Sequence, residues 1–581
     1  MDFTVRTEEN AGCKVLMTPL GKAPDGAELY RLSLSFAAPT VPGTVTVSWK
    51  EPMVGVRSLW HPTAGRIRRL PQWFSPADCP SCLYKGAPLL ALIGPEDRNV
   101  LTVALSEASA PCLLRFYVDD FAEKNELGLE IRLFTEPTAP MTEYACLLRL
   151  DRQDRLYSDA VRAAADWWNT LPGAPARPVR SLETAAPFIY SSWYSFHQDP
   201  TAEGLLRELR LAAEAGAELA ILDDGWQFDG AGTGDYRSAG EWACSREKFP
   251  DMAAFVREAH ALGIRLMVWF SVPFAGHDTA VWPRFRDKLL YEDARHRAGI
   301  LDPRYPEVRD FIRETLLGFV RATGIDGLKL DFIDSFRLTE ASPVFAEGMD
   351  TASVAEGVKR LLTGIREEAL ALDPDFLIEF RQDYVGPAVT CFGDLIRVGD
   401  CAYDPLANRI GIADLRLFTA GPEVSSDMLY WSPDAPLSEV ALQLLDTLFS
   451  VPQISVKLSE CPREQCLLVE RFIRYWRENR ELLLHGRFSA SQPGSLYSKA
   501  SAADGNSRIS VLYTDRALRL AAAREDIWNA TGEEGLLLEN PEGRKLRVTL
   551  FDLLLNEKER FETEAPLVRL ALAPGEHAEL R

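Results

Sequence analysis

Hydrophobic and polar residues follow one pattern at the two ends of the chain. Up to about Thr170, short apolar runs are separated by Gly, Pro and Asp, as in GTVTVSWK, LLALIGPEDRNVLTVALS and LGLEIRLFT. From about Phe488 the same pattern returns in SRISVLYT, KLRVTLFDLLLN and VRLALAPGEHAEL. Short apolar runs bounded by turn residues are typical of strands joined by hairpins. We therefore expect a β-sandwich at each end of the chain.

The middle of the chain, from about Ala185 to Arg480, has a different pattern. Apolar strands alternate there with helices that carry an apolar stripe, which is typical of parallel βα units. The predicted strands are PFIYSSW, ELAILDDGW, RLMVWF, GLKLDF, FLIEF and DLIRVGD, with weaker ones near Val424 and at PQISVK. The predicted helices are TAEGLLRELRLAAEAG, DMAAFVREAHALG, YPEVRDFIRETLLGFVRATG and TASVAEGVKRLLTGIREEALAL. About eight units over roughly 300 residues is the size of a (β/α)8 barrel.

A helix and a proline-rich segment separate the first two parts. SDAVRAAADWWNTL has helical periodicity, and PGAPARPVR after it reads as a linker. The sequence therefore predicts an α/β protein, a (β/α)8 TIM barrel flanked by two sandwiches. Its domains are an N-terminal sandwich with linker helix over 1–178, a barrel over 179–484 and a C-terminal sandwich over 485–581.

Composition narrows the class of partner. The 581 residues are 46% hydrophobic and carry a formal charge of −21, with the basic residues dispersed along the chain. A dispersed minority of cations argues against nucleic acid and against a membrane surface as partner, and favours a neutral substrate. No apolar run has transmembrane length, and the start MDFTVRTEENAG carries charges where a signal peptide is apolar. We expect a cytoplasmic protein.

The cysteines give no metal or redox signal. Cys79 and Cys82 are the one pair at CxxC spacing, and neither a second pair nor a histidine cluster accompanies them. Two reduced thiols are the simplest interpretation, because a zinc site needs about four ligands.

Polar residues recur where the predicted barrel strands end. The carboxyl ends of the strands in such a barrel meet at one mouth, so these side chains are expected to share one site. The residues concerned are Trp193, Asp223, Asp224, Trp226, Trp269, Lys329, Asp331, Glu379, Arg381, Arg397 and Asp400.

These residue types favour one kind of chemistry. Carboxylates, a lysine, arginines and tryptophans without a histidine make a poor zinc site and a poor serine-type triad. They suit a sugar, because hydroxyls need charged acceptors and donors, the ring stacks on aromatics, and glycoside cleavage needs two carboxyl groups in different roles. A single strand-end aspartate is more often a helix cap or a surface ion pair, and only the coincidence of five such strand ends favours a functional site. A magnesium enzyme is disfavoured because Lys329 would repel the ion.

Three segments in order resemble the barrel of the α-galactosidases (melibiases) of glycoside hydrolase family 36 and the related family 27. They are LAILDDGWQFD, EKFPDMAAFVREAHALGIRLMVWF and LDPRYPEVRDFIRETLLGFVRATGIDGLKLDF. The resemblance covers about Pro187 to Asp400. It implies an N-terminal β-supersandwich, a catalytic barrel and a C-terminal β-sandwich, a carbohydrate substrate, no metal or organic cofactor, and a homo-oligomer whose interface no stretch marks.

The resemblance also implies roles for the strand-end residues. Asp331 in KLD would be the nucleophile and Asp400 the acid and base of a retaining double displacement, with their carboxyl groups about 5–5.5 Å apart. Asp394 lies six residues before Asp400 and is the alternative acid and base. The other residues would contact the sugar: Asp223, Asp224 and Lys329 its hydroxyls, Trp193, Trp226 and Trp269 as walls, and Glu379, Arg381 and Arg397 its remaining hydroxyls.

Two segments depart from the family pattern. FIDSF follows KLD where a further polar residue is usual, and IEFRQDYVGPAVTCFGD replaces a Cys/Gly-rich sugar-binding segment after the fifth strand. That segment reads the 2-position of the sugar in the family, so an α-N-acetylgalactosaminide, a β-L-arabinopyranoside or a modified hexoside stays open beside an α-galactoside. A transglycosylase of the raffinose synthase type and a non-catalytic sugar-binding protein are the alternative functions.

Overall fold

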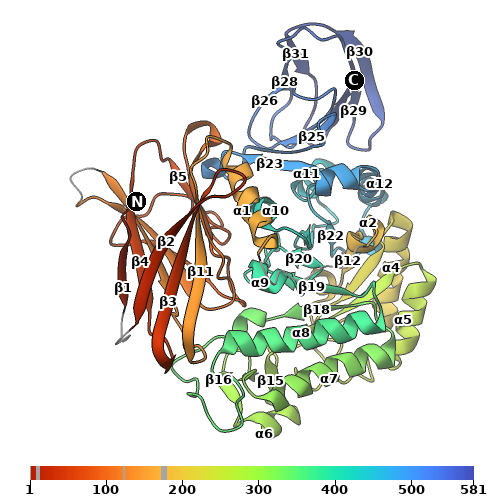
Figure 1. Ribbon diagram of the computed structural model, residues 1–581. Coiled ribbons are helices and arrows are strands. Elements are labelled where there is room, and N and C mark those ends of the chain that lie inside the picture. Colours follow the sequence, from red (N-terminus) through yellow and green to blue (C-terminus); the bar gives the residue numbers. More distant parts are fainter. Residues whose placement is uncertain (1, 8–12, 122–124, 172–179) are drawn as a thin grey trace.

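The N-terminal part is a sandwich of two antiparallel sheets. The computed structural model describes residues 2–7, 13–121, 125–171 and 180–581. A five-stranded sheet (order β1-β4-β10-β9-β6) faces a six-stranded one (order β2-β3-β11-β8-β7-β5), and their inner side chains form one core (Figure 1). The strands are β1 Thr4–Thr7, β2 Lys14–Lys22, β3 Glu28–Thr40, β4 Val45–Pro52, β5 Ser58–Trp60, β6 Ala77–Ser81, β7 Leu89–Ile93, β8 Asn99–Leu105, β9 Cys112–Asp119, β10 Glu126–Leu133 and β11 Met141–Asp151.

Helix α1 (Tyr157–Asn169) follows the sandwich and packs on β7 and β8. Its apolar stripe explains this position, since its buried residues recur at helical spacing. Residues 172–179 of the predicted proline-rich linker lie outside the described residues. The chain re-enters the described part before the short helix α2 (Leu182–Ala185). The domain limits at 178 and 484 stay predictions.

The middle of the chain is the predicted barrel. Eight parallel strands form one sheet in the order β21-β20-β19-β18-β14-β13-β12-β22, and a parallel bridge between Ser425 and Val451 joins its two edges. The strands are β12 Ile189–Ser191, β13 Leu219–Leu222, β14 Arg265–Ser271, β18 Gly327–Asp331, β19 Leu377–Arg381, β20 Leu395–Arg397, β21 Glu423–Ser425 and β22 Gln453–Ile454. All eight predicted strands are present, and the predicted fold class is confirmed.

The barrel helices begin and end at the expected signals. Thr201 caps α4 through a bond from the Gly204 backbone N–H, and Gly216 ends that helix with a φ of 104°. The helices of this part are α3 Trp193–Phe196, α4 Ala202–Ala215, α5 Met252–Ala261, α7 Pro306–Thr323, α8 Val354–Leu372, α9 Pro387–Thr390, α10 Pro405–Phe418, α11 Leu437–Asp446 and α12 Arg463–His485.

One insertion was not predicted from the sequence. Between β14 and α7 the chain forms the short helix α6 (Val281–Phe285) and a three-stranded antiparallel sheet. Its strands are β15 Phe274–Gly276, β16 Leu289–Asp293 and β17 Ala298–Leu301. Each strand is too short to show a period, and the segment between them is rich in charge, so the hydrophobic pattern does not predict this sheet.

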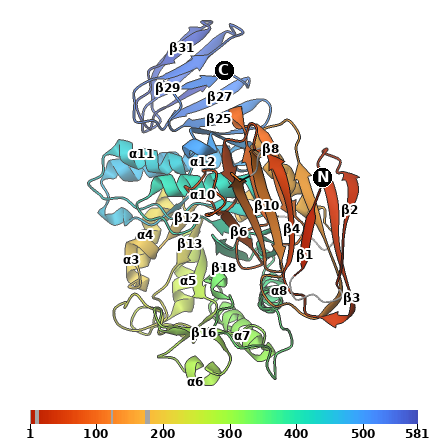
Figure 2. The same cartoon turned by 90° about the vertical axis from the view of Figure 1, so that its left-hand side faces the viewer.

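The C-terminal part is the second predicted sandwich, and it stacks on α11 and α12 (Figure 2). A seven-stranded sheet (order β23-β24-β25-β27-β32-β29-β30) packs on a three-stranded one (order β26-β28-β31). The strands are β23 Arg487–Ser491, β24 Lys499–Ala503, β25 Ser507–Leu512, β26 Ala517–Arg519, β27 Arg524–Asn529, β28 Leu536–Glu539, β29 Leu546–Phe551, β30 Glu557–Thr563, β31 Leu567–Leu570 and β32 His577–Leu580.

A buried polar network joins the three parts. Asp414 on α10 accepts hydrogen bonds from Trp60 Nε1 at 2.8 Å, from Arg68 Nη2 at 2.6 Å and from the Tyr497 hydroxyl. Trp60 and Arg68 belong to the N-terminal sandwich and Tyr497 precedes β24. Because α10 begins five residues after Asp400, this network fixes the barrel segment that follows that residue.

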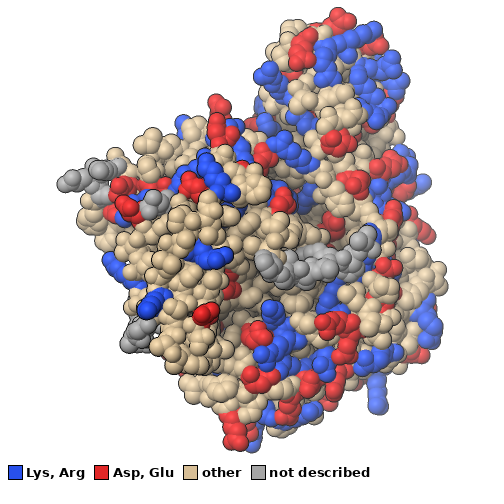
Figure 3. Space-filling model, in the orientation of Figure 1, with Lys and Arg blue, Asp and Glu red and all other residues tan. Residues whose placement is uncertain are grey.

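The surface carries charges of both signs, and the thiols are free. On the face shown in Figure 3, acidic and basic side chains intermingle over the barrel helices. None of the helices in the described ranges has the length and apolar composition to cross a bilayer. All ten cysteines are free, and burial raises the pKa of the Cys79 and Cys82 thiols to about 12.

Candidate active site

The strand-end residues meet at the carboxyl ends of the barrel strands, as the register requires. Trp269, Lys329 and Glu379 pair across β14, β18 and β19, and Arg381 pairs with Arg397 across β19 and β20. Side chains in register on neighbouring parallel strands point to the same side of the sheet. The alternation of apolar and polar residues in GLKLD therefore places Lys329 and the final aspartate of that strand together inside the barrel.

Asp331 is the most strongly held carboxylate of the site. Its Oδ2 accepts a bond from Trp269 Nε1 at 2.9 Å, and its Oδ1 accepts bonds from Arg381 Nε at 2.6 Å and from the Phe332 backbone N–H at 2.7 Å. Burial raises the pKa of Asp331, but the charges of Arg381 and Lys329 outweigh burial and hold it well below its ordinary value. This carboxylate is ionised at any working pH.

Asp400 is the most open carboxylate of the site. Its side chain is 64% exposed, and its Oδ1 accepts a bond from Arg397 Nη2 at 2.8 Å. Desolvation and the charge of Asp331 raise the pKa of Asp400, but Arg397 and Lys329 lower it below its ordinary value. The coupling with Asp331 means that the two carboxyl groups lie within electrostatic reach of each other, although they come from different strand ends.

Asp394, the alternative to Asp400, lies at the other end of β20. It immediately precedes the strand, and its carboxylate pairs with Arg180 and, at 2.5 and 2.8 Å, with Arg366. It also accepts a bond from the Ile378 backbone N–H. These contacts belong to the amino end of the barrel strands, so Asp394 is remote from Asp331.

Two neighbouring aspartates after β13 occupy different environments. Asp223 Oδ2 accepts a bond from Lys329 Nζ at 2.5 Å. Asp224 accepts bonds at 2.6 Å from the amides of Gln198 and Gln227. Burial, reinforced by the charge of Asp223, raises the pKa of Asp224 to about 6. The pair therefore presents one carboxylate that is fixed by a cation and one that is held by neutral donors.

Glu379, Trp226 and Trp269 are buried, and Trp193 is partly exposed. Glu379 is fully buried and accepts bonds from Gln453 and Ser425. Trp226 and Trp269 are 0% and 1% exposed, whereas Trp193 at the start of α3 is half-buried. Direct sugar contact by these residues stays a prediction, and the burial of Trp226 and Trp269 favours a supporting role for both rings.

Five residues near the site were missed from the sequence. Asp427 accepts bonds from the Tyr194 hydroxyl at 2.7 Å and from the Cys401 backbone N–H, and it pairs with Arg397. Asp427 follows β21, a strand of three residues whose weak pattern hid its end. The other missed residues are Tyr194, Gln198, Gln227 and Tyr236, and they lie in α3 or in loops where no periodicity marks them.

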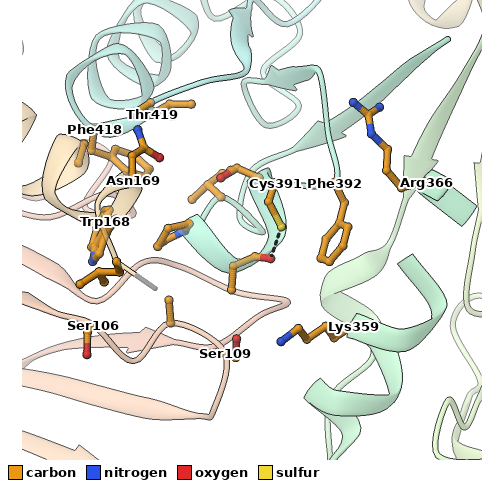
Figure 4. Close-up of a pocket in the computed structure, with 18 of the residues that line it drawn as sticks. Ser106, Ser109, Trp168, Asn169, Lys359, Arg366, Cys391, Phe392, Phe418 and Thr419 are labelled. Atoms are coloured by element: carbon orange, nitrogen blue, oxygen red, sulfur yellow. Dashed lines mark hydrogen bonds between the residues drawn. The ribbon is translucent and has the colours of Figure 1, made fainter. Parts of the chain in front are cut away.

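A separate cavity of about 550 Å³ lies outside the barrel mouth (Figure 4). It is lined by residues from the β8–β9 connection, α1, α8, α9 and the end of α10. Its Arg366 is paired with Asp394, and its Cys391 thiol donates to the Ala388 carbonyl at 3.0 Å. None of the strand-end carboxylates lines it, so it is not the site described above.

No grouping of three or more His, Cys, Asp or Glu side chains able to hold a metal ion occurs in the part of the chain that the structure describes. The cations beside Asp331, Asp400 and Asp223 explain this, because each carboxylate already faces a lysine or an arginine.

Comparisons with known proteins point to one class, a barrel of the melibiase type. The melibiase family matches residues 177–361. Alpha-galactosidase AgaA of Geobacillus stearothermophilus is 28% identical over 151 residues, which are 25% of this chain and 20% of that protein. Alpha-galactosidase Mel36A of Lactobacillus acidophilus is 24% identical over 202 residues, 33% of this chain and 27% of that protein. The matched segment thus spans only a fifth to about a quarter of these relatives.

Solved structures extend the likeness to the whole chain. A structure of AgaA in complex with raffinose covers 100% of this chain and 86% of its own, with a TM-score of 0.65 at 15% identity. The galactosidase domain of the alpha-galactosidase-sucrose kinase AgaSK gives a TM-score of 0.64 at 11% identity, over 100% and 85% of the two chains. At such identities the likeness concerns the fold. The resemblance to the family 36 α-galactosidases that the sequence suggested is therefore confirmed.

Proposed function

We propose that the chain is a retaining, exo-acting α-glycosidase of the α-galactosidase type, which hydrolyses a terminal α-linked sugar through a covalent glycosyl-enzyme. The contrast between two carboxyl groups carries the proposal. Asp331 is buried and bonded to a guanidinium and two N–H groups, whereas Asp400 is 64% exposed and bonded to one guanidinium. A retaining glycosidase needs this asymmetry, because one carboxylate attacks and the other exchanges protons with the leaving group and with water.

In the first step Asp331 attacks the anomeric carbon, and the bond from that carbon to the leaving oxygen breaks. The protonated Asp400 gives its proton to the leaving oxygen. Trp269 and Arg381 orient the two oxygens of Asp331 from different sides. Such fixed donors reduce the reorganisation that the attack requires.

In the second step Asp400 removes a proton from water, and the water oxygen attacks the anomeric carbon to release Asp331. In the free enzyme the charge of Asp331 partly offsets the lowering of the Asp400 pKa by Arg397 and Lys329. Ester formation removes that charge, so the pKa of Asp400 falls when it has to act as a base. This electrostatic coupling therefore supports the second step, in which Asp400 acts as a base.

The remaining strand-end groups suit the hydroxyls of one sugar ring. Asp223, Asp224 and Lys329 offer two carboxylates and an ammonium group within one small region. Hydroxyls donate to carboxylates and accept from ammonium groups, so this set is matched to a polyol rather than to an apolar ligand. The names of the relatives, all alpha-galactosidases, support a galactoside as the first sugar to test.

Turnover on a panel of aryl glycosides tests the proposal. The panel holds α-galactoside, α-N-acetylgalactosaminide, β-L-arabinopyranoside, α-glucoside and α-xyloside, and each is measured with wild type, Asp331→Ala and Asp334→Asn. Asp334 is the matched control, because it lies three residues on and its carboxylate also pairs with Arg381, at 3.6 Å. We expect one sugar to be cleaved with retention, Asp331→Ala to be inactive, and Asp334→Asn to keep most of the activity.

Two outcomes would contradict the proposal. Appreciable turnover by Asp331→Ala excludes this residue as nucleophile, and release of the inverted anomer excludes the covalent route. Product analysis with a sugar acceptor present separates hydrolysis from transfer, since a transferase favours the acceptor over water.

A further inference from the structure

Tyr236 occupies a fixed position beside the proposed nucleophile. It lies in the loop between β13 and α5, and its ring stacks on Trp269 with centroids 5.9 Å apart and planes inclined by 29°. Phe332 meets the ring edge-on at 5.1 Å, and the Tyr236 backbone N–H donates to the His296 carbonyl at 2.9 Å. Trp269 and Phe332 are the residues whose side-chain and backbone N–H groups hold Asp331. The Tyr236 ring is therefore packed against the two residues that hold the proposed nucleophile.

The loop that carries Tyr236 is also tied to the paired aspartates. Gln198 donates from Nε2 to Asp224 at 2.6 Å and to the Asp235 carbonyl at 3.1 Å, and its Oε1 accepts from the Gly234 backbone N–H at 2.7 Å. One side chain thus links the residues before Tyr236 to a carboxylate of the site. This link limits how far the tyrosine moves away from the carboxylates.

The hydroxyl of Tyr236 lies within electrostatic reach of four carboxylates of the site. Burial and the charges of Asp224, Asp331, Asp223 and Asp400 raise the pKa of Tyr236 well above its ordinary value. The phenol therefore keeps its proton and acts as a donor. Over residues 2–7, 13–121, 125–171 and 180–581, no partner accepts a hydrogen bond from this hydroxyl, and the side chain is half-buried.

The other polar groups around the hydroxyl already have protein partners. Asp223 pairs with Lys329, Asp224 accepts from two amides, and Asp331 accepts from Trp269 and Arg381. A neutral donor without such a partner, within electrostatic reach of several carboxylates, is matched to a ligand hydroxyl that accepts one bond from it and donates others to the carboxylates. The aromatic ring below it also covers the face of Trp269, which is only 1% exposed.

We propose that Tyr236 determines the specificity of this site: its hydroxyl donates a hydrogen bond to one ring hydroxyl of the bound sugar, and its ring forms the aromatic wall. This inference rests on the proposed function and adds a residue that reads the substrate. A site built to bond a hydroxyl rejects the analogue that lacks it, because the protein group is then left without a partner.

The test is a substrate–variant cycle with the sugar that wild type cleaves. The kcat/KM is measured for wild type and Tyr236→Phe on the parent aryl glycoside and on its four monodeoxy analogues, at positions 2, 3, 4 and 6. We expect Tyr236→Phe to lower kcat/KM on the parent about tenfold. On the one deoxy analogue that lacks the contacted hydroxyl, wild type and variant should have equal kcat/KM.

A second tyrosine supplies the matched control. Tyr30 in the N-terminal sandwich is also half-buried, but its hydroxyl already donates to Glu28 Oε2 at 3.0 Å. Tyr30→Phe should leave all five substrates unchanged. Equal kcat/KM for wild type and Tyr236→Phe on the parent overturns the inference, and so does a uniform loss on every analogue, because a structural defect has no preference for one hydroxyl.

Failure of the proposed function gives a different result. If wild type cleaves none of the glycosides, the affinity of wild type and Tyr236→Phe for galactose is measured by calorimetry. Weaker binding by the variant supports the role of Tyr236 and contradicts only the hydrolytic function. Equal affinities overturn the role of Tyr236, and absence of binding to wild type overturns both.

Discussion

The Nε atom of Arg381 lies 2.6 Å from Oδ1 of Asp331, so a guanidinium from β19 directly holds the carboxylate proposed as nucleophile. Arg381 belongs to FRQDYVG, the segment that departs from the family pattern. Its charge is the chief reason why Asp331 stays ionised despite burial. This altered segment therefore contributes to the electrostatics of the reaction as well as to the shape of the site.

Replacing this arginine should move the pH profile. In Arg381→Gln the pKa of Asp331 rises, so the acidic limb of kcat/KM moves to higher pH. Loss of the charge-assisted bond should also lower kcat/KM about 10- to 100-fold at neutral pH. The pH dependence of kcat/KM checks both effects. Arg207→Gln on the outer face of α4 is the control, and an unchanged acidic limb in Arg381→Gln would contradict the assignment.

Substitution of Asp400 and substitution of Asp394 should have different effects. Asp400→Ala removes the proton donor, so kcat should fall about 10²- to 10⁴-fold on substrates with poor leaving groups and far less on an activated aryl glycoside. Added azide should restore turnover. Asp394→Ala leaves Arg366 and Arg180 without their shared partner, so it should destabilise the fold by about 3–5 kcal/mol without dependence on the leaving group. Loss of azide rescue in Asp400→Ala would assign the proton transfer elsewhere.

Asp427 should influence the pKa of Asp400, the proposed acid and base, through Arg397. Asp427 pairs with the same guanidinium that lowers the pKa of Asp400. In Asp427→Asn that guanidinium is less neutralised, so the pKa of Asp400 falls further and the alkaline limb of kcat/KM moves to lower pH. Tyr194→Phe removes only the neutral donor to Asp427 and should shift the limb less. A shift to higher pH in Asp427→Asn would contradict the proposed coupling.

His577 should make the fold sensitive to acid. It is 2% exposed, lies between the rings of Trp528 and Phe551, and burial lowers its pKa to about 3 from an unfolded value of 6.5. The unfolded chain therefore takes up a proton below pH 6.5 that the folded chain refuses until about pH 3. Stability is fully present above pH 6.5 and is lost as the pH falls, by about 3 kcal/mol near pH 4.

Denaturant unfolding of wild type and His577→Phe between pH 7.5 and pH 4 measures this effect. The variant should lose less stability over that range, whereas His485→Gln, which changes an exposed histidine on α12, should not protect the fold. Equal acid sensitivity of wild type and His577→Phe would assign the effect to other groups.

The barrel and its polar strand ends were predictable because both follow from short-range patterns. GLKLDF and ELAILDDGW carry apolar runs that end in charge, and the topology of a barrel brings such ends together. The alternation of residues along a strand does not show which aromatic ring stays accessible to a ligand once the loops have folded over the site. Trp226 and Trp269 looked like walls, yet Trp242 stacks on the first and Tyr236 on the second.

The residues that the sequence did not indicate depend on tertiary contacts. Tyr236 and Gln198 lie in loops without periodicity, and their roles follow from bonds to residues more than twenty positions away. Asp427 follows the three-residue strand β21, whose end was hard to recognise. Ion pairs such as Arg381 with Asp331 join residues fifty positions apart, and only the closed barrel brings them together.

The most direct test of the account is to trap the glycosyl-enzyme. Wild type is incubated with a fluorinated, activated glycoside of the sugar that it cleaves, and the intact protein and its peptides are analysed by mass spectrometry. The account predicts one added glycosyl group on the peptide that contains Asp331, and none in Asp331→Asn. An adduct on another residue, or turnover of the parent sugar with inversion and no adduct, would contradict it.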